Sequence, residues 1–130
     1  MLANLSQLST PQIPNYQKYW ILEVEKFIAE KACNSNLQVA DIAQAQGMSE
    51  RQFYRRVKHI LGTTPNMLIQ HIRLELAKVY LENGEYATVA EVAYAVGYNR
   101  PEYFSSLFAK WYDKRPVDFK RRSCFRSMAG

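Results

Sequence analysis

Residues 88–108, TVAEVAYAVGYNRPEYFSSLF, contain the pattern that decides the fold: a short helix with apolar spacing, a glycine at Gly97 and a second apolar-spaced helix. The same plan occurs earlier in the chain around Gly47, which lies 50 residues before Gly97. Beyond the two glycines the offset becomes 51 residues, as between Phe53 and Phe104. Two helices joined by a tight glycine turn form a helix-turn-helix motif, and two such motifs in one chain point to duplex DNA as the partner.

Apolar residues recur at helical spacing along most of the chain. The first helix is expected to bury Trp20, Val24, Phe27 and Ile28. The connecting helix between the motifs carries Leu68, Ile69, Ile72, Leu76, Val79 and Tyr80. We predict an all-α fold of about seven helices, in which two helix-turn-helix subdomains are joined by a long connecting helix. The helices are expected over residues 16–31, 39–46, 50–61, 66–82 and 88–96, from about 100 to beyond 111, and over 116–122.

Composition and breaker residues divide the chain into five segments. Residues 1–15 are polar and contain two prolines, so we expect a linker or a disordered leader. Residues 16–65 are expected to form the first subdomain and residues 66–83 the connecting helix. The second subdomain follows over residues 84–122, and residues 123–130 form a basic tail.

Polar residues at capping-box spacing mark where several helices begin. At a helix start, a hydroxyl or amide side chain can accept from the backbone N–H of a glutamate or glutamine three residues later. The side chain of that glutamate or glutamine accepts in return from the backbone N–H of the first residue. Pro101 also suits the first turn of a helix, where its missing N–H costs nothing. The predicted capping pairs are Ser49 with Gln52, Thr88 with Glu91, and Asn99 with Glu102.

The formal charge of +5 is unevenly distributed. Residues 49–80 carry six basic and two acidic side chains, and residues 100–130 carry eight and three, so positive charge gathers at the second helix of each motif. Such a distribution favours an anionic partner. The two cysteines, Cys33 and Cys124, define no disulfide framework. With no signal peptide and no long apolar span in this segment, we expect a cytoplasmic location without membrane contact.

The exposed face of the helix over residues 50–61 carries the first candidate DNA-binding residues. Arg51, Tyr54 and Arg55 lie opposite the apolar positions and could reach base edges in a major groove. Arginine suits the O6 and N7 atoms of guanine, whereas tyrosine can contact a thymine methyl or a phosphate. Arg56 and Lys58 lie nearer the flanks, where we expect phosphate contacts. The alternative is that this face is merely a solvated, basic helix surface.

Two stretches, VADIAQAQGMSERQFYRRVKHILGTTP (39–65) and VAEVAYAVGYNRPEYFSSLFAKWYDKRP (89–116), resemble the paired motifs of AraC/XylS-type transcription regulators. A narrower similarity links residues 20–31, together with SNLQVADIA (35–43), to the output domains of hybrid two-component regulators. The resemblance implies a bacterial-type regulator whose two recognition helices enter successive major-groove segments from one monomer. It carries over Arg51, Tyr54 and Arg55 as base readers of the first motif and Arg100, Glu102 and Ser106 as candidates of the second. The other candidate DNA-binding residues are Asn99 and Ser105 in the second motif and Lys114 and Arg115 just beyond it.

The second motif departs from the family pattern on its exposed face. Ser106 stands where arginine is usual and Ala109 where lysine is frequent, so two long donors are missing. Glu102 would repel phosphates unless it accepts from a cytosine amino group. Asp113 replaces a usual glycine, although aspartate tolerates a positive φ better than most residues do. We therefore predict asymmetric recognition, in which the first motif supplies most of the sequence specificity.

The sequence is also compatible with other classes of function. A helical protein-interaction module without specific DNA readout is the main alternative. Catalysis is disfavoured because neither cysteine sits in a nucleophile motif, and the two histidines lack partners at metal-site spacing, so we expect no catalytic or metal residues and no cofactor. RNA is disfavoured because the A-form major groove is too narrow for a helix. The basic residues Lys114, Arg115, Lys120, Arg121, Arg122 and Arg126 could bind phosphates or form a solvated tail.

Arg73, in the connecting helix, is expected to form a partly buried structural ion pair, with Glu75 or Asp41 as candidate partners. Beyond this segment, a transcription regulator would engage RNA polymerase or other transcription machinery. We also expect a sensor or receiver domain in the parent chain.

Overall fold

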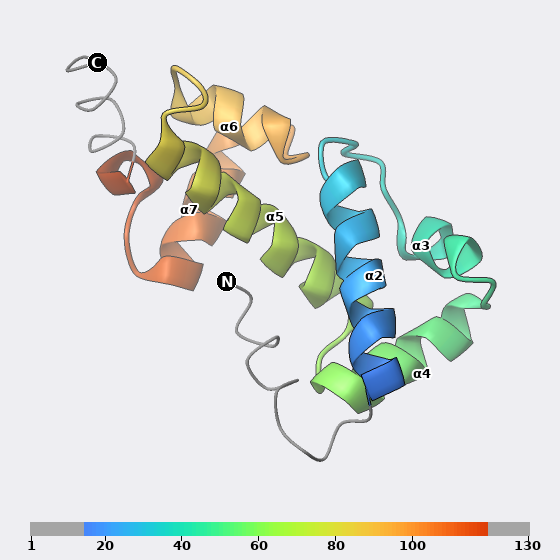
Figure 1. Cartoon of the computed structure of the whole chain (residues 1–130). Helices are drawn as coiled ribbons and strands as arrows, with labels where there is room; N and C mark the ends of the chain where they lie inside the picture. Colours follow the sequence, from blue (N-terminus) through green and yellow to red (C-terminus); the bar gives the residue numbers. More distant parts are fainter. Residues whose placement is uncertain (1–14, 120–130) are drawn as a thin grey trace. The chain divides into compact units, whose positions relative to one another are not determined.

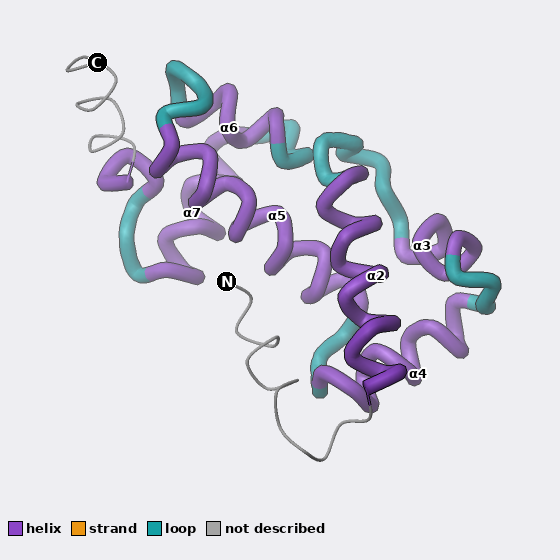
Figure 2. Tube along the Cα trace, viewed as in Figure 1, coloured by secondary structure: helices purple, strands orange, loops and turns teal. Residues whose placement is uncertain are grey.

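The computed structural model describes residues 15–119. This part of the chain consists of helices joined by loops and turns, without strands (Figures 1 and 2). Six helices are followed by one further helical turn over residues 116–119, which confirms the predicted all-α class with seven helical segments. Most of the leader, the end of the last predicted helix and the basic tail fall outside the described residues. The helices are α2 (Asn15–Lys31), α3 (Val39–Ala45), α4 (Glu50–Leu61), α5 (Pro65–Asn83), α6 (Val89–Ala95) and α7 (Pro101–Tyr112).

The described residues form two compact units, each built around one helix-turn-helix motif. The first unit contains residues 15–31 and 36–72, and therefore α2, α3, α4 and the first part of α5. The second contains residues 32–35 and 73–119, with the rest of α5, α6 and α7. The short segment over residues 32–35 thus belongs to the second unit although it lies between two helices of the first.

In the first unit, the buried face of α2 differs from the face that its aromatic residues predict. Val24 and Ile28 are buried as expected, but Trp20 and Phe27 are only half-buried. Ile21 and Glu25 take the buried positions instead. The expected burial of Trp20 and Phe27 was therefore wrong in part, because a helix buries one contiguous stripe and Ile21, Val24, Glu25 and Ile28 form that stripe at spacings of three and four.

The motif of the first unit packs its two helices through small and apolar side chains. Ile42 and Ala43 of α3 are buried, as are Phe53 and Val57 of α4. Trp20 of α2 meets the Phe53 ring edge-on, with ring centroids 5.8 Å apart. These contacts fix which face of α4 turns inward, so its basic residues face outward.

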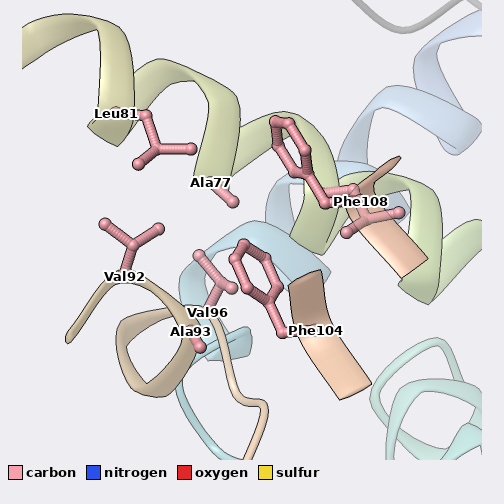
Figure 3. Close-up of a cluster of buried hydrophobic side chains, with 8 residues drawn as sticks. Ala77, Leu81, Val92, Ala93, Val96, Phe104 and Phe108 are labelled. Carbon is pink, nitrogen blue, oxygen red and sulfur yellow. The ribbon is translucent and has the colours of Figure 1, made fainter. Parts of the chain in front are cut away.

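The core of the second unit is a cluster of buried aliphatic and phenylalanine side chains. Figure 3 shows side chains of α5, α6 and α7 pointing toward one another. Phe104 and Phe108 lie on adjacent turns of α7 with their rings tilted against each other and the ring centroids 5.7 Å apart. The buried members are Leu74, Ala77, Leu81, Val92, Ala93, Val96, Phe104 and Phe108.

The connecting helix α5 does not bury one continuous stripe. In the first unit its buried residues include Leu68, Ile69 and Ile72, as predicted. In the second unit they are Leu74, Ala77 and Leu81, whereas the predicted Leu76 and Tyr80 are only half-buried and Val79 is exposed. At about 100° per residue, the second set lies on a different face from the first. The change arises because each part of the helix packs within its own unit.

The glycine turns adopt the backbone that the repeat requires. Gly47 and Gly97 have φ of 70° and 94°, a left-handed region that L side chains rarely adopt. Asp113, where the first copy has Gly62, also adopts a positive φ of 59°. The turn after α7 therefore survives the glycine-to-aspartate replacement, as predicted.

Two of the three predicted helix caps are confirmed and the third was wrong. The Ser49 hydroxyl accepts from the N–H of Gln52, and Thr88 makes the same bond with Glu91. For α7 the N-cap is Arg100 rather than Asn99, with no hydrogen bond from the cap side chain. Pro101 takes the first helical position, so the extra residue of the second copy lengthens the turn and delays the helix by one residue.

Replacing Ser49 with alanine is expected to lower the free energy of unfolding of the first unit by about 1 kcal/mol, because the N–H of Gln52 loses its acceptor. Chemical denaturation would measure the loss. Ser106→Ala, at an exposed position of α7 beyond its first turn, is the matched control and should cost almost nothing. Equal losses in the two variants would contradict a capping role for Ser49.

Candidate nucleic-acid interface

The exposed face of α4 carries the densest group of long polar side chains on a described helix. Arg51, Tyr54, Arg55 and Lys58 are all exposed, whereas Phe53 and Val57 on the opposite face are fully buried. Arg51 and Arg55 lie one helical turn apart, so their guanidinium groups can address neighbouring positions of a ligand along the helix axis. Each guanidinium offers a planar fork of donors that matches two acceptors at once.

Shallow hollows flank this exposed face on both sides. One is lined by Gln52, Tyr54, Arg55, Arg56, Lys58 and His59. The other is lined by Val39, Glu50, Arg51, Tyr54, Arg55, Pro65 and Asn66. These hollows leave both sides of the exposed α4 face accessible to a ligand.

Arg56, predicted to lie on the flank of α4, is only half-exposed. Its guanidinium stands over the ring of Trp20, 4.1 Å from the ring centroid. A cation over the face of an indole ring is attracted by the ring quadrupole. The contact ties Arg56 to α2 and gives the half-buried Trp20 a packing role.

The equivalent face of α7 is nearly free of cations. Glu102 and Ser106 are exposed, and Ser105 and Ala109 are half-exposed. Lys110, in the last turn, is the sole basic residue of this helix. The two motifs therefore share a scaffold but present different chemistry.

The remaining predicted site residues lie at the two ends of α7. Asn99 and Arg100 are exposed in the turn before the helix, and Lys114 and Arg115 are exposed after it. The guanidinium of Arg115 pairs with the carboxylate of Asp118 at 3.5 Å. Because both side chains are largely exposed, the pair contributes little stability and leaves Arg115 accessible to an anion.

Tyr103 is an exposed residue of the second motif that sequence reasoning missed. Tyr94 on α6 and Tyr103 on α7 expose 53% and 51% of their surface, but only Tyr103 lies on the second helix of the motif. The signal was present in the repeat, since the equivalent first-copy residue, Gln52, is not aromatic. Attention to charged side chains alone overlooked this neutral donor.

Arg73 does not make the carboxylate pair expected of it. Its guanidinium donates to the backbone carbonyl of Asn34 at 2.8 Å and stands 5.7 Å from the centroid of the Tyr98 ring. Both suggested partners are engaged elsewhere. Asp41 accepts from the N–H of Gln38, and Glu75 accepts from the hydroxyl of Tyr112 at 2.8 Å. Arg73 is therefore a structural residue of the second unit.

Burial changes the ionisation of several groups in the second unit. Desolvation raises the pKa of Tyr98 to about 12, with the charge of Arg73 opposing the rise. Desolvation also raises the pKa of Tyr112, and the hydrogen bond to Glu75 adds to the effect. Burial lowers the pKa of Arg73, although an arginine stays charged at neutral pH. Both tyrosines are therefore neutral packing and hydrogen-bonding groups.

None of the helices within residues 15–119 combines the length and apolarity needed to cross a membrane. These residues also contain no grouping of three or more histidine, cysteine, aspartate or glutamate side chains that could hold a metal ion.

The sequence model of a helix-turn-helix domain matches residues 42–122. The chain is 32% identical over 124 residues to the transcriptional activator RhrA of Rhizobium meliloti, covering 92% of this chain and 36% of RhrA. It is 30% identical over 97 residues to histidine kinase P4 of Formosa agariphila, covering 75% of this chain and 7% of that protein. It therefore spans only a minor part of both relatives.

A solved structure with a similar fold is the DNA-binding domain of AdpA, a global transcriptional factor, in complex with a target DNA. The two chains superpose with a TM-score of 0.70 at 25% identity, over 85% of this chain and 97% of the other. The family match extends over more than half of the present chain and covers all of the two motifs except residues 39–41. The chain belongs to the AraC-type family of helix-turn-helix domains, which are DNA-binding domains of transcription regulators.

Proposed function

We propose that α4 and α7 enter successive major-groove segments of one duplex, and that α4 provides most of the sequence specificity. The observation that carries this proposal is the difference between the two exposed faces. Four long polar side chains project from α4, whereas the corresponding positions of α7 hold a glutamate, serines and an alanine. The scaffold of each motif is the same, so this difference in side chains sets what each helix can read.

Residue roles follow from side-chain chemistry. Arg51 and Arg55 donate to the O6 and N7 atoms of guanines, and Tyr54 contacts a thymine methyl or a phosphate. Arg56 and Lys58 contact phosphates, with Arg56 oriented by the ring of Trp20. In the second motif, Glu102 accepts from a cytosine amino group. The other second-motif contacts position the duplex and come from Asn99, Arg100, Ser105, Ser106, Lys114 and Arg115.

The whole protein would be a cytoplasmic transcription regulator of which this segment is the DNA-reading part. RhrA is named a transcriptional activator, and both relatives extend well beyond the matched segment. The match to a histidine kinase supports a sensor or receiver region in the parent chain. RNA polymerase or other transcription machinery would be the further partner.

Selection of binding sites from a random duplex pool tests the proposal directly. We expect enrichment of one asymmetric site with two conserved segments one helical turn apart, about 34 Å along the duplex. Affinity for that site should exceed affinity for RNA and for single strands at the same salt concentration. A pool that yields no enriched sequence would favour the alternative, a helical protein-interaction module.

Arg51→Ala and Arg55→Ala are each expected to weaken binding to the selected site by about 1–3 kcal/mol and to relax base preference within one segment. Repeating the site selection with each variant measures the change in preference. Arg100→Ala and Glu102→Ala are the comparison variants and should alter base preference less. A larger relaxation in this second pair would overturn the asymmetric assignment.

A further inference from the structure

We propose that Tyr103 is a DNA-backbone contact of the second motif, with its hydroxyl donating a hydrogen bond to a phosphate oxygen. The inference rests on the proposed function, because it requires α7 to lie in a major groove. Tyrosine hydroxyls are among the neutral groups that bind phosphates in protein–DNA complexes. Such a contact would let a motif with few cations hold its segment of the duplex.

The position of Tyr103 on α7 suits a backbone contact rather than a base contact. Phe104 and Phe108 define the buried side of the helix, and Glu102 and Ser106 lie near the middle of the exposed side. At about 100° per residue, Tyr103 falls on one flank of that exposed side. A helix in the major groove meets base edges along its middle and a sugar–phosphate backbone along each flank.

The ring of Tyr103 is supported while its hydroxyl is left available. Its ring centroid lies 6.1 Å from that of Tyr98. Tyr98 is held in turn by the Phe104 ring at 5.6 Å and by the guanidinium of Arg73 at 5.7 Å. Tyr103 makes no hydrogen bond to any side chain within residues 15–119. A side chain oriented before binding loses less conformational entropy when it contacts the ligand.

Comparison of the two motifs shows why this side chain is free for a ligand. The first-copy equivalent of Tyr103 is Gln52, whose Oε1 accepts from the N–H of Ser49 at 3.0 Å. That glutamine is therefore committed to the helix cap. In the second copy the N-cap, Arg100, makes no side-chain cap bond, so the position of Tyr103 is released from capping.

The charge difference between the helices gives the contact a measurable signature. α4 carries four arginine and lysine side chains, Arg51, Arg55, Arg56 and Lys58, whereas α7 has only Lys110. A cationic contact releases counter-ions from DNA. It therefore steepens the slope of log affinity against log salt concentration by about 0.9 per charge. A neutral hydroxyl adds affinity without changing that slope.

The test compares Tyr103→Phe with Tyr94→Phe in the full chain, on the duplex selected by the wild-type protein. Both variants remove only a hydroxyl, and the two tyrosines are almost equally exposed. We expect Tyr103→Phe to weaken binding about tenfold, as for a hydrogen bond to a charged group, with the same salt slope as wild type. Tyr94→Phe should bind as the wild type does. Thermal melts verify that both variants are folded.

Three results would overturn the inference while leaving the proposed function intact. The first is unchanged affinity in Tyr103→Phe, which would mean that the hydroxyl does not contact DNA. The second is a salt slope in Tyr103→Phe that differs from that of the wild type. The third is an equal loss of affinity in Tyr94→Phe. Failure of the wild-type chain to select any duplex would instead remove the proposed function, and this contact with it.

Discussion

Gly97→Ala is expected to destabilise the second unit by about 2–5 kcal/mol. A φ of 94° costs an alanine about 1–2 kcal/mol by itself. The added Cβ would also collide with the carbonyl oxygen of Ala32 and lie 2.9 Å from Nε of Arg73. Relief by movement is difficult because the segment after Ala32 is held by the bond from Arg73 to the carbonyl of Asn34. Overpacking of this kind adds a further 1–3 kcal/mol or so.

The matched control is Gly47→Ala, at the equivalent turn of the first unit. Gly47 has a similar φ of 70°, but a Cβ there would meet nothing within 4 Å. Its loss should be limited to the backbone term of about 1–2 kcal/mol. Amide hydrogen exchange measures the opening of each unit separately, through α6 and α7 in one and α3 and α4 in the other. Equal losses in the two variants would show that the collision with Ala32 is unimportant.

Glu25→Gln is expected to stabilise the first unit by up to about 3 kcal/mol at pH 8 and by almost nothing at pH 4. Glu25 is 6% exposed, and neither carboxylate oxygen has a hydrogen-bond partner. Desolvation raises its pKa from 4.5 to about 7. The unfolded chain therefore loses its proton at lower pH than the folded one, so wild-type stability falls as pH rises from about 4.5 to 7. Each pKa unit corresponds to about 1.4 kcal/mol.

Urea denaturation at pH 4, 6 and 8 measures this effect. The wild-type curve should lose stability across the interval, and the variant should lose less, with the difference reaching its full size above pH 7. Glu23 lies on the same helix with an exposed side chain, so Glu23→Gln is the control and should follow the wild-type profile. A wild-type protein whose stability does not fall between pH 4 and 8 would contradict the burial of an unpaired carboxyl group.

The exposed face of α4 could be predicted because amphipathic spacing identifies both sides of a helix at once. Placing Phe53 and Val57 inside leaves Arg51, Tyr54 and Arg55 outside, as the structure has them. Their contacts with DNA stay a prediction. Tyr103 escaped notice because the sequence does not reveal that its first-copy counterpart, Gln52, is consumed by a cap while the tyrosine is not.

The start of α7 shows where local rules fail. Asn99 and Glu102 have capping-box spacing, yet the helix begins at Pro101 with Arg100 as its cap. Proline strongly favours the first helical position, and this preference outweighs a side-chain cap one residue earlier. Spacing alone could not rank the two signals.

The sequence by itself determined the helices, their glycine turns and the repetition of one motif, because these follow from local backbone preferences and from apolar periodicity within single helices. The tertiary structure decided which positions of α2 and α5 are buried. It turned Glu25 inward in place of Trp20, changed the buried face along α5, and gave Arg73 a backbone carbonyl instead of a carboxylate. These outcomes depend on contacts between residues distant in sequence, such as Arg73 with Asn34 and Gly97 with Ala32, which no local pattern encodes.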